Sequence, residues 1–281
     1  MGADCVTFVA CSACVGKPDQ VPFTSGFINT RMTNFRHWPI LAMLFTPGLL
    51  AAQTPTDTLH VYGPGGPFGP LNECAALFGQ QTGHPVKVVA GPDVVWLADA
   101  QQRADLFFGG SEYMLTQFTA AHPDLVDAAS RTELYRRAAA ILVRPGNPKQ
   151  IKTLRDLTKP GITILDVNGA GQLGLWEDLA GRQNLIGGIQ ANIGQSFANS
   201  ALGIAAWKQD SRYDAWITYA SWHNRLTTET AVVSLPPSEV VFRGTPIALS
   251  KTTRQADTAR QFVQFLQSDK GHAVFKKWGW D

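Results

Sequence analysis

The sequence predicts an α/β protein with two lobes, each a mostly parallel sheet flanked by helices. Short apolar runs alternate with helix-like segments, and glycine-rich turns follow several of the runs. The predicted strands cover residues 59–62, 86–90, 105–108, 138–143, 162–166, 214–218, 231–234 and 247–249. The predicted helices cover residues 71–80, 94–103, 111–121, 151–157, 174–181 and 200–208, with two more in the last 26 residues.

The domain organisation follows from the strand that covers residues 138–143. An Arg-Pro-Gly-Asn-Pro turn follows it, which indicates a crossing strand that leaves one lobe. We expect residues 53–139 and 243–281 to form lobe one, and residues 140–242 to form lobe two. Apolar residues near the helical period in the last segment predict two helices packed on lobe one, with Ser268 as the N-cap of the second.

The N-terminal part has the pattern of an export signal. A short basic start at residues 32–38 precedes an apolar run at 39–50, and the segment ends in the small residues Ala51 and Ala52. We expect a signal peptide at residues 32–52, cleavage near Ala52 and a periplasmic location; the alternative is an N-terminal core helix. Residues 1–31 are then interpreted as a mis-called, disordered extension. No cysteine directly follows the cleavage site, so we expect no lipid anchor.

Composition excludes several classes of function. The chain of 281 residues has a formal net charge of only +2, which argues against nonspecific nucleic-acid binding. Cys11 and Cys14 lack a second pair of ligands nearby, and the histidines lack metal-ligand spacing, so we expect no metal site and no cofactor. No acid/base pair or nucleophile motif supports an enzyme.

Glycine-rich loops at strand ends are the main candidates for a binding site. A strand, a Gly/Pro turn and a helix aim free backbone N–H groups at one point, which attracts anions. From lobe one the candidates are Gly65, Gly66, Pro67, Gly110 and Ser111, and from lobe two Gly169, Ala170, Gly171 and Gln172. The alternatives are ordinary βα turns and, for Ser111, a helix N-cap.

Four side chains are further candidates. Arg182 can grip a carboxylate or phosphate bidentately, although it can instead pair with Glu177 or Asp178. Trp96 and Trp222 can wall a cleft or lie in the core, and Thr218 can donate a hydroxyl.

Several segments resemble a known family. Residues 257–280 look like the C-terminal signature of molybdate- and sulfate-type periplasmic binding proteins. Residues 62–67, 91–96, 104–109, 169–171, 176–182, 214–222 and 275–280 resemble, in order, accessory colonization factor AcfC and its relatives. The resemblance implies a type II periplasmic binding fold, no catalysis, an ABC permease partner and a small anionic ligand. Residues 172–175 replace a Ser/Thr-rich loop of that family, which leaves the ligand's identity open.

The sequence therefore favours a periplasmic receptor that captures a carboxylate, phosphorylated acid or oxyanion between two lobes for an ABC importer. An adhesion or colonisation factor with the same fold is the alternative. An exported enzyme and, because of the eight tryptophans, a sugar receptor are weaker hypotheses. The oligomeric state stays open.

Overall fold

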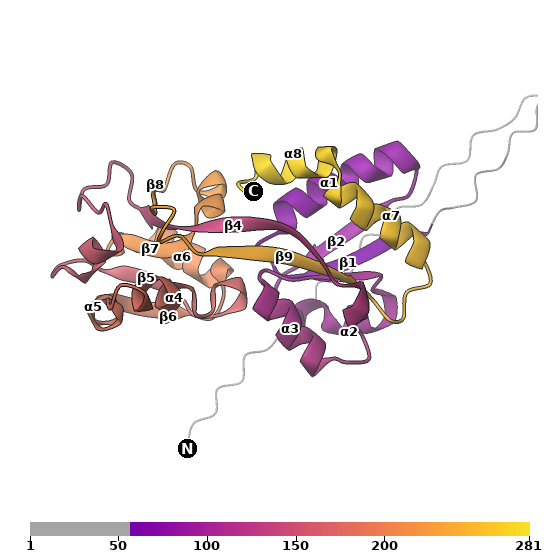
Figure 1. Ribbon diagram of the computed structural model, residues 1–281, viewed down its shortest axis with the longest axis horizontal. Helices are drawn as coiled ribbons and strands as arrows, with labels where there is room; N and C mark the ends of the chain where they lie inside the picture. The colour runs from indigo at the N-terminus through magenta and orange to yellow at the C-terminus, as the bar shows by residue number, and fades with distance from the viewer. Residues whose placement is uncertain (1–56) are drawn as a thin grey trace, which may run out of the picture. The chain divides into compact units, whose positions relative to one another are not determined.

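The structure, a computed structural model, describes residues 57–281 (Figure 1). These residues all belong to one unit of the chain, Ala52–Asp281. The predicted extension, signal peptide and cleavage site lie outside the described residues. No helix among residues 57–281 is long and apolar enough to cross a membrane.

Strands and helices alternate along the described chain. The strands are β1 (Leu59–Gly63), β2 (Val86–Ala90), β3 (Leu106–Phe108), β4 (Thr132–Val143), β5 (Ile164–Val167), β6 (Ile193–Phe197), β7 (Ala215–Tyr219), β8 (Ala231–Ser234) and β9 (Phe242–Leu249). The α-helices are α1 (Phe68–Thr82), α2 (Asp93–Arg103), α3 (Glu112–Ala121), α4 (Leu175–Gly181), α5 (Ile186–Ala191), α6 (Ser200–Gln209), α7 (Ala256–Gln267) and α8 (Asp269–Lys277). Short 3-10 turns include η2 (Leu154–Thr158), η3 (Ala170–Gln172) and η4 (Ala220–Arg225).

Two long strands, β4 and β9, connect the two ends of the sheet. The strand order is β2-β1-β3-β9-β4-β7-β5-β6, with β8 also paired to β4. β1 pairs in parallel with β2 and β3, and β5 pairs in parallel with β6 and β7. All antiparallel pairs among the named strands involve β4 or β9. Figure 1 shows these two strands running side by side between the groups of parallel strands.

Side-chain alternation along β1 and β3 builds two cores on the opposite faces of one sheet. Val61 and Phe108 pack with α1, α7 and α8, whereas Tyr62 and Phe107 pack with α2 and α3. Successive residues of a strand point to opposite faces, so each strand supplies both cores. The C-terminal helices α7 and α8, yellow in Figure 1, therefore return to the indigo α1.

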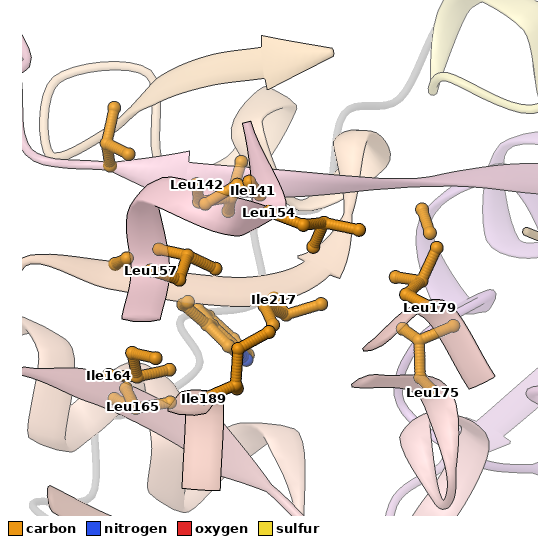
Figure 2. Close-up of a cluster of buried hydrophobic side chains, with 14 of the residues drawn as sticks. Ile141, Leu142, Leu154, Leu157, Ile164, Leu165, Leu175, Leu179, Ile189 and Ile217 are labelled. Atoms are coloured by element: carbon orange, nitrogen blue, oxygen red, sulfur yellow. The ribbon is translucent and has the colours of Figure 1, made fainter. Parts of the chain in front are cut away.

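The other end of the sheet has its own core. Figure 2 shows this cluster, in which leucine and isoleucine side chains of β4, β5 and β7 meet those of η2, α4 and α5. Trp207 and Trp216 are fully buried in it. The lobe boundaries at residues 139/140 and 242/243 stay predictions. β4 crosses the first boundary and β9 crosses the second.

Most predicted elements are present. The predictions at 86–90 and 231–234 match β2 and β8, and Ser268 caps α8 by accepting from the Gly271 N–H at 3.3 Å. β6 and α5 were not predicted, because β6 is mostly exposed and α5 contains two glycines. β4 and β9 begin five or six residues earlier than predicted. The predicted helix at 151–157 is wrong in type: a 3-10 turn begins there at Leu154, after a Thr153 capping box.

Two neighbouring glycines of α5 give a matched test of packing. A Cβ added at Gly188 would lie 2.8 Å from Thr158 Cβ, whereas one at Gly187 would meet nothing within 4 Å. Gly188→Ala should lower the free energy of unfolding by about 1–3 kcal/mol through overpacking. Gly187→Ala should raise it by up to about 1 kcal/mol, because alanine favours helix. Urea denaturation of both variants checks this; equal midpoints would contradict the packing of α5 on η2.

Candidate anion-binding cleft

Glycine loops from the two ends of the sheet meet. Gly110 follows β3 and Gly171 follows β5, yet a Cβ added at Gly110 would lie 3.5 Å from Gly171 Cα. A Cβ added at Gly171 would collide with the Gly110 carbonyl. The approach requires that Gly171 lack a side chain. The N–H groups of Gly65, Gly66, Gly110 and Gly171 donate no hydrogen bond within residues 57–281.

A cavity of about 200 Å³ lies between these loops. Its lining has no aspartate and no glutamate, and two arginines are its only charged side chains. The lining residues are Pro64, Gly65, Gly66, Gly91, Pro92, Gly110, Met114, Arg137, Ala170, Gly171, Gln172, Asn199, Ser200, Ala201, Ile204, Tyr219, Trp222 and Arg225.

Arg137 is the buried cation of the cavity. It lies on β4, is 2% exposed, and its guanidinium carbon stands 3.9 Å from the centroid of the Tyr219 ring. One terminal nitrogen donates to the Gly110 carbonyl, while Nε has no partner among the described residues. A Cβ added at Gly66 would lie 3.3 Å from Arg137 Nη1, so the guanidinium also borders the first glycine loop. Buried arginines are ordinarily paired, so this one is poised for an anion.

Arg225 is the second cation, and it bridges to the first glycine loop. It lies at the end of η4 and donates from Nη1 to the Gly65 carbonyl and from Nη2 to the Gly66 carbonyl, each at 3.2 Å. Its guanidinium carbon lies 5.0 Å from the Trp222 ring centroid and 5.8 Å from that of Trp278. These contacts hold the charge at the rim of the cavity.

Neither arginine has a carboxylate partner. No ion pair within residues 57–281 includes Arg137 or Arg225. Burial lowers the pKa of the Arg137 guanidinium, and the nearby Arg225 lowers it further. Burial also lowers the pKa of Arg225. Arginine stays protonated at neutral pH even so, and the cavity therefore carries uncompensated positive charge.

Comparisons with known proteins identify the family of this chain. Residues 59–281 match the family described as bacterial extracellular solute-binding protein. The chain belongs to this family. The molybdate-binding protein ModA of Mycobacterium bovis is 26% identical over 189 residues, which cover 61% of this chain and 71% of ModA.

Solved structures of several other proteins share the fold. Peb3 from Campylobacter jejuni is 29% identical, with a TM-score of 0.71, over 79% of this chain and 98% of Peb3. An L-phospholactate-bound PEB3 is 30% identical, with a TM-score of 0.74 and the same coverage. The molybdate-binding protein of Azotobacter vinelandii, at 17% identity and a TM-score of 0.60, shows similarity of fold. The predicted two-lobed periplasmic binding fold is confirmed.

The structure of this solute-binding protein brings seven predicted site residues to the cavity: Gly65, Gly66, Gly110, Ala170, Gly171, Gln172 and Trp222. The other six do not line it. Pro67 is buried before α1, and Ser111 caps α3 by accepting from the Met114 N–H. Thr218 is fully buried in β7, and its hydroxyl has no partner among the described residues.

The remaining three have structural positions of their own. Trp96 lies on α2 and donates its indole N–H to the Gly91 carbonyl at 3.0 Å. Gly169 closely approaches the Ala198 carbonyl, which leaves no room for a Cβ. Arg182 is exposed at the end of α4, and the predicted alternative for it is wrong, because Asp178 pairs with Arg243 instead.

Sequence reasoning missed Arg137, Tyr219 and Arg225. Arg137 directly precedes the predicted strand 138–143, where a charged residue is ordinarily solvent-exposed. Arg225 follows Trp222 by three residues, and that spacing with an aromatic residue was the available signal. Both positions become informative only once β4 and η4 are placed in space.

Arg137 and Arg144 form a matched pair for a stability test. Both stack 3.9 Å from an aromatic centroid, but Arg144 also donates to the carbonyls of Trp207, Asp210 and Tyr213. Arg137→Met should leave the free energy of unfolding without ligand unchanged, or raise it by up to about 2 kcal/mol, because it removes an unpaired buried charge.

Arg144→Met should instead lower the free energy of unfolding by about 3 kcal/mol, because several charge-assisted hydrogen bonds are lost. Urea denaturation in anion-poor buffer measures both variants. An equal loss of stability in the two would show that Arg137 is a structural residue.

Proposed function

We propose that this protein is a periplasmic receptor that binds a small anion in the cleft and delivers it to an ABC permease. One observation carries the proposal: two guanidinium groups without carboxylate partners face one acid-free cavity. The unpaired N–H groups of the glycine loops supply further donors. Such a set suits carboxylate, phosphate or another oxyanion.

The chemistry of the relatives supports the same ligand class. The names of the related proteins mention molybdate and L-phospholactate, which are both anions. Two guanidiniums plus backbone donors match an anion with two acidic groups, or a dianionic oxyanion. The related proteins are binding proteins, and we extend this to the present chain: it binds and releases its ligand unchanged.

Location, origin and partner complete the proposal. The family is extracellular, and the signal pattern at residues 32–52 supports export with cleavage near Ala52. The AcfC-like segments support placement in that branch of the family. Contacts of one ligand to loops from both lobes would favour the closed state, which a permease recognises.

Arg225 should contribute directly to ligand affinity. Arg225→Gln removes one charge and its contacts to the first glycine loop, so affinity should fall by about 10- to 100-fold, as for a lost charge-assisted hydrogen bond. Isothermal titration against phosphate, molybdate, sulfate and phospholactate measures this. Arg212→Gln is the control, because Arg212 is exposed and paired with Asp210. Equal affinity in the two variants would remove Arg225 from the site, and no binding of any anion by folded wild-type protein would overturn the receptor function.

Gly171 should be needed for closure rather than for folding. Its substitution by alanine places a methyl group against the Gly110 carbonyl, so the two loops cannot reach the observed contact. Gly171→Ala should fold normally but keep a larger radius of gyration with ligand present, and bind at least about tenfold more weakly. X-ray scattering with and without ligand checks this, with Gly187→Ala as the control. Ligand-induced compaction equal to that of the control would contradict the role of Gly171.

A further inference from the structure

A second cavity adjoins the arginine cavity. It measures about 250 Å³ and shares Pro64, Met114 and Ala170 with the first. Apart from Leu173, its other walls come from β1, β3, α2, α3 and the residues that flank them, so most of it lies on the lobe-one side of the cleft. The two cavities thus have a common wall of three small or flexible residues.

The walls of the second cavity are aromatic. Tyr62, Trp96, Phe107 and Phe118 line it, and neighbouring ring centroids lie 5.2–5.8 Å apart for Phe107–Phe118, Trp96–Phe118 and Tyr62–Trp96. Packed aromatic rings bury large apolar areas and favour an apolar occupant.

The polar atoms of these rings are already used. The Tyr62 hydroxyl donates to Asp99 Oδ2 at 2.5 Å, and Trp96 Nε1 donates to the Gly91 carbonyl at 3.0 Å. The rings therefore offer carbon faces, not hydrogen bonds, to anything that enters. Against these rings a sugar would lose its hydration without compensation, whereas an alkyl or aryl group would not.

The two cavities differ in the charged side chains that line them. Arg137 and Arg225 line only the first, while the second has no lysine or arginine and has Asp93 in its wall. An anionic group would be repelled from the second cavity and attracted to the first. One ligand that occupies both must therefore have a charged end and an apolar end.

Two residues at the partition suit such a ligand. Met114 has an unbranched, flexible thioether, which adapts to a passing apolar chain. Ala170 has φ +49°, a left-handed conformation that favours glycine, and both its neighbours in the loop are glycines. A side chain held at this unfavourable position borders both cavities.

We infer that the ligand is an amphipathic anion, such as an alkyl or aryl phosphate or carboxylate, with its acidic group at Arg137 and Arg225 and its apolar body in the aromatic cavity. This inference rests on the proposed receptor function. Leu173, which is 41% exposed, lines the aromatic cavity from the lobe-two loop, so closure would bring an apolar side chain onto the ligand's body.

A homologous ligand series tests the inference. Isothermal titration of wild-type protein with phosphate and with methyl, ethyl, propyl, butyl and phenyl phosphate compares one acidic group with growing apolar bodies. Affinity should rise by about fourfold per methylene from methyl to butyl, the factor expected for burying a methylene group. The heat capacity change of binding should become more negative along the same series.

A pair of leucine variants tests whether the gain in affinity with chain length arises in the aromatic cavity. Leu173→Asn should flatten the rise with chain length while leaving the affinity for methyl phosphate unchanged. Leu202→Asn is the matched control, because Leu202 is 51% exposed and lines neither cavity; its series should be parallel to wild type.

Binding of phosphate and methyl phosphate with no gain from methyl to butyl, or a loss, would overturn the amphipathic ligand and leave the receptor function intact. A gain that Leu173→Asn and Leu202→Asn affect equally would also overturn it. Failure of the whole series, phosphate included, together with failure of the other anions, would overturn the receptor function itself.

Discussion

The cleft depends on one unpaired charge, the Arg137 guanidinium, held between an aromatic ring and a carbonyl. Removing such a group from water is unfavourable by several kcal/mol unless it is paired. The Tyr219 ring at 3.9 Å, the Trp280 ring at 5.0 Å and the Gly110 carbonyl compensate only part of this. In the receptor that we propose, an anion in the cavity would supply the rest, so ligand binding and stabilisation of the closed form would have the same physical origin.

The strand that carries this charge also connects the two cores. β4 pairs with β9 over its first part and with β7 and β8 over its second part, and Arg137 lies opposite Arg243 near the change of partner. A residue at this point remains near both cores whatever angle they adopt. In the receptor that we propose, the ligand's main countercharge would thus be placed where lobe movement displaces it least, while closure would bring in Gly110 and Gly171.

The sequence predicted the features that local physics determines. A strand, a glycine-rich turn and a helix can be recognised within fifteen residues, and Gly65, Gly110 and Gly171 do meet at one cavity. It did not predict which charged side chain would face them. Arg182 and Arg225 are equally plausible from the sequence, because the difference between them lies in long-range placement: one ends exposed on α4, the other reaches the Gly65 and Gly66 carbonyls about 160 residues away.

The outcome for Trp96 also depends on long-range placement, which the sequence does not show. The sequence predicts that Trp96 walls a cleft. Trp96 does line a cavity, but this is the aromatic cavity and not the adjoining arginine cavity. Hydrogen-bond accounting decides what that means: because the indole N–H is satisfied by Gly91, the ring offers only its apolar face. Backbone donors and guanidiniums recognise the charge of a ligand, whereas satisfied aromatic rings recognise what the charge is attached to. A receptor that needed only an oxyanion would gain nothing from an aromatic cavity beside the arginine cavity, since filling that space would bury more apolar surface and stabilise the fold.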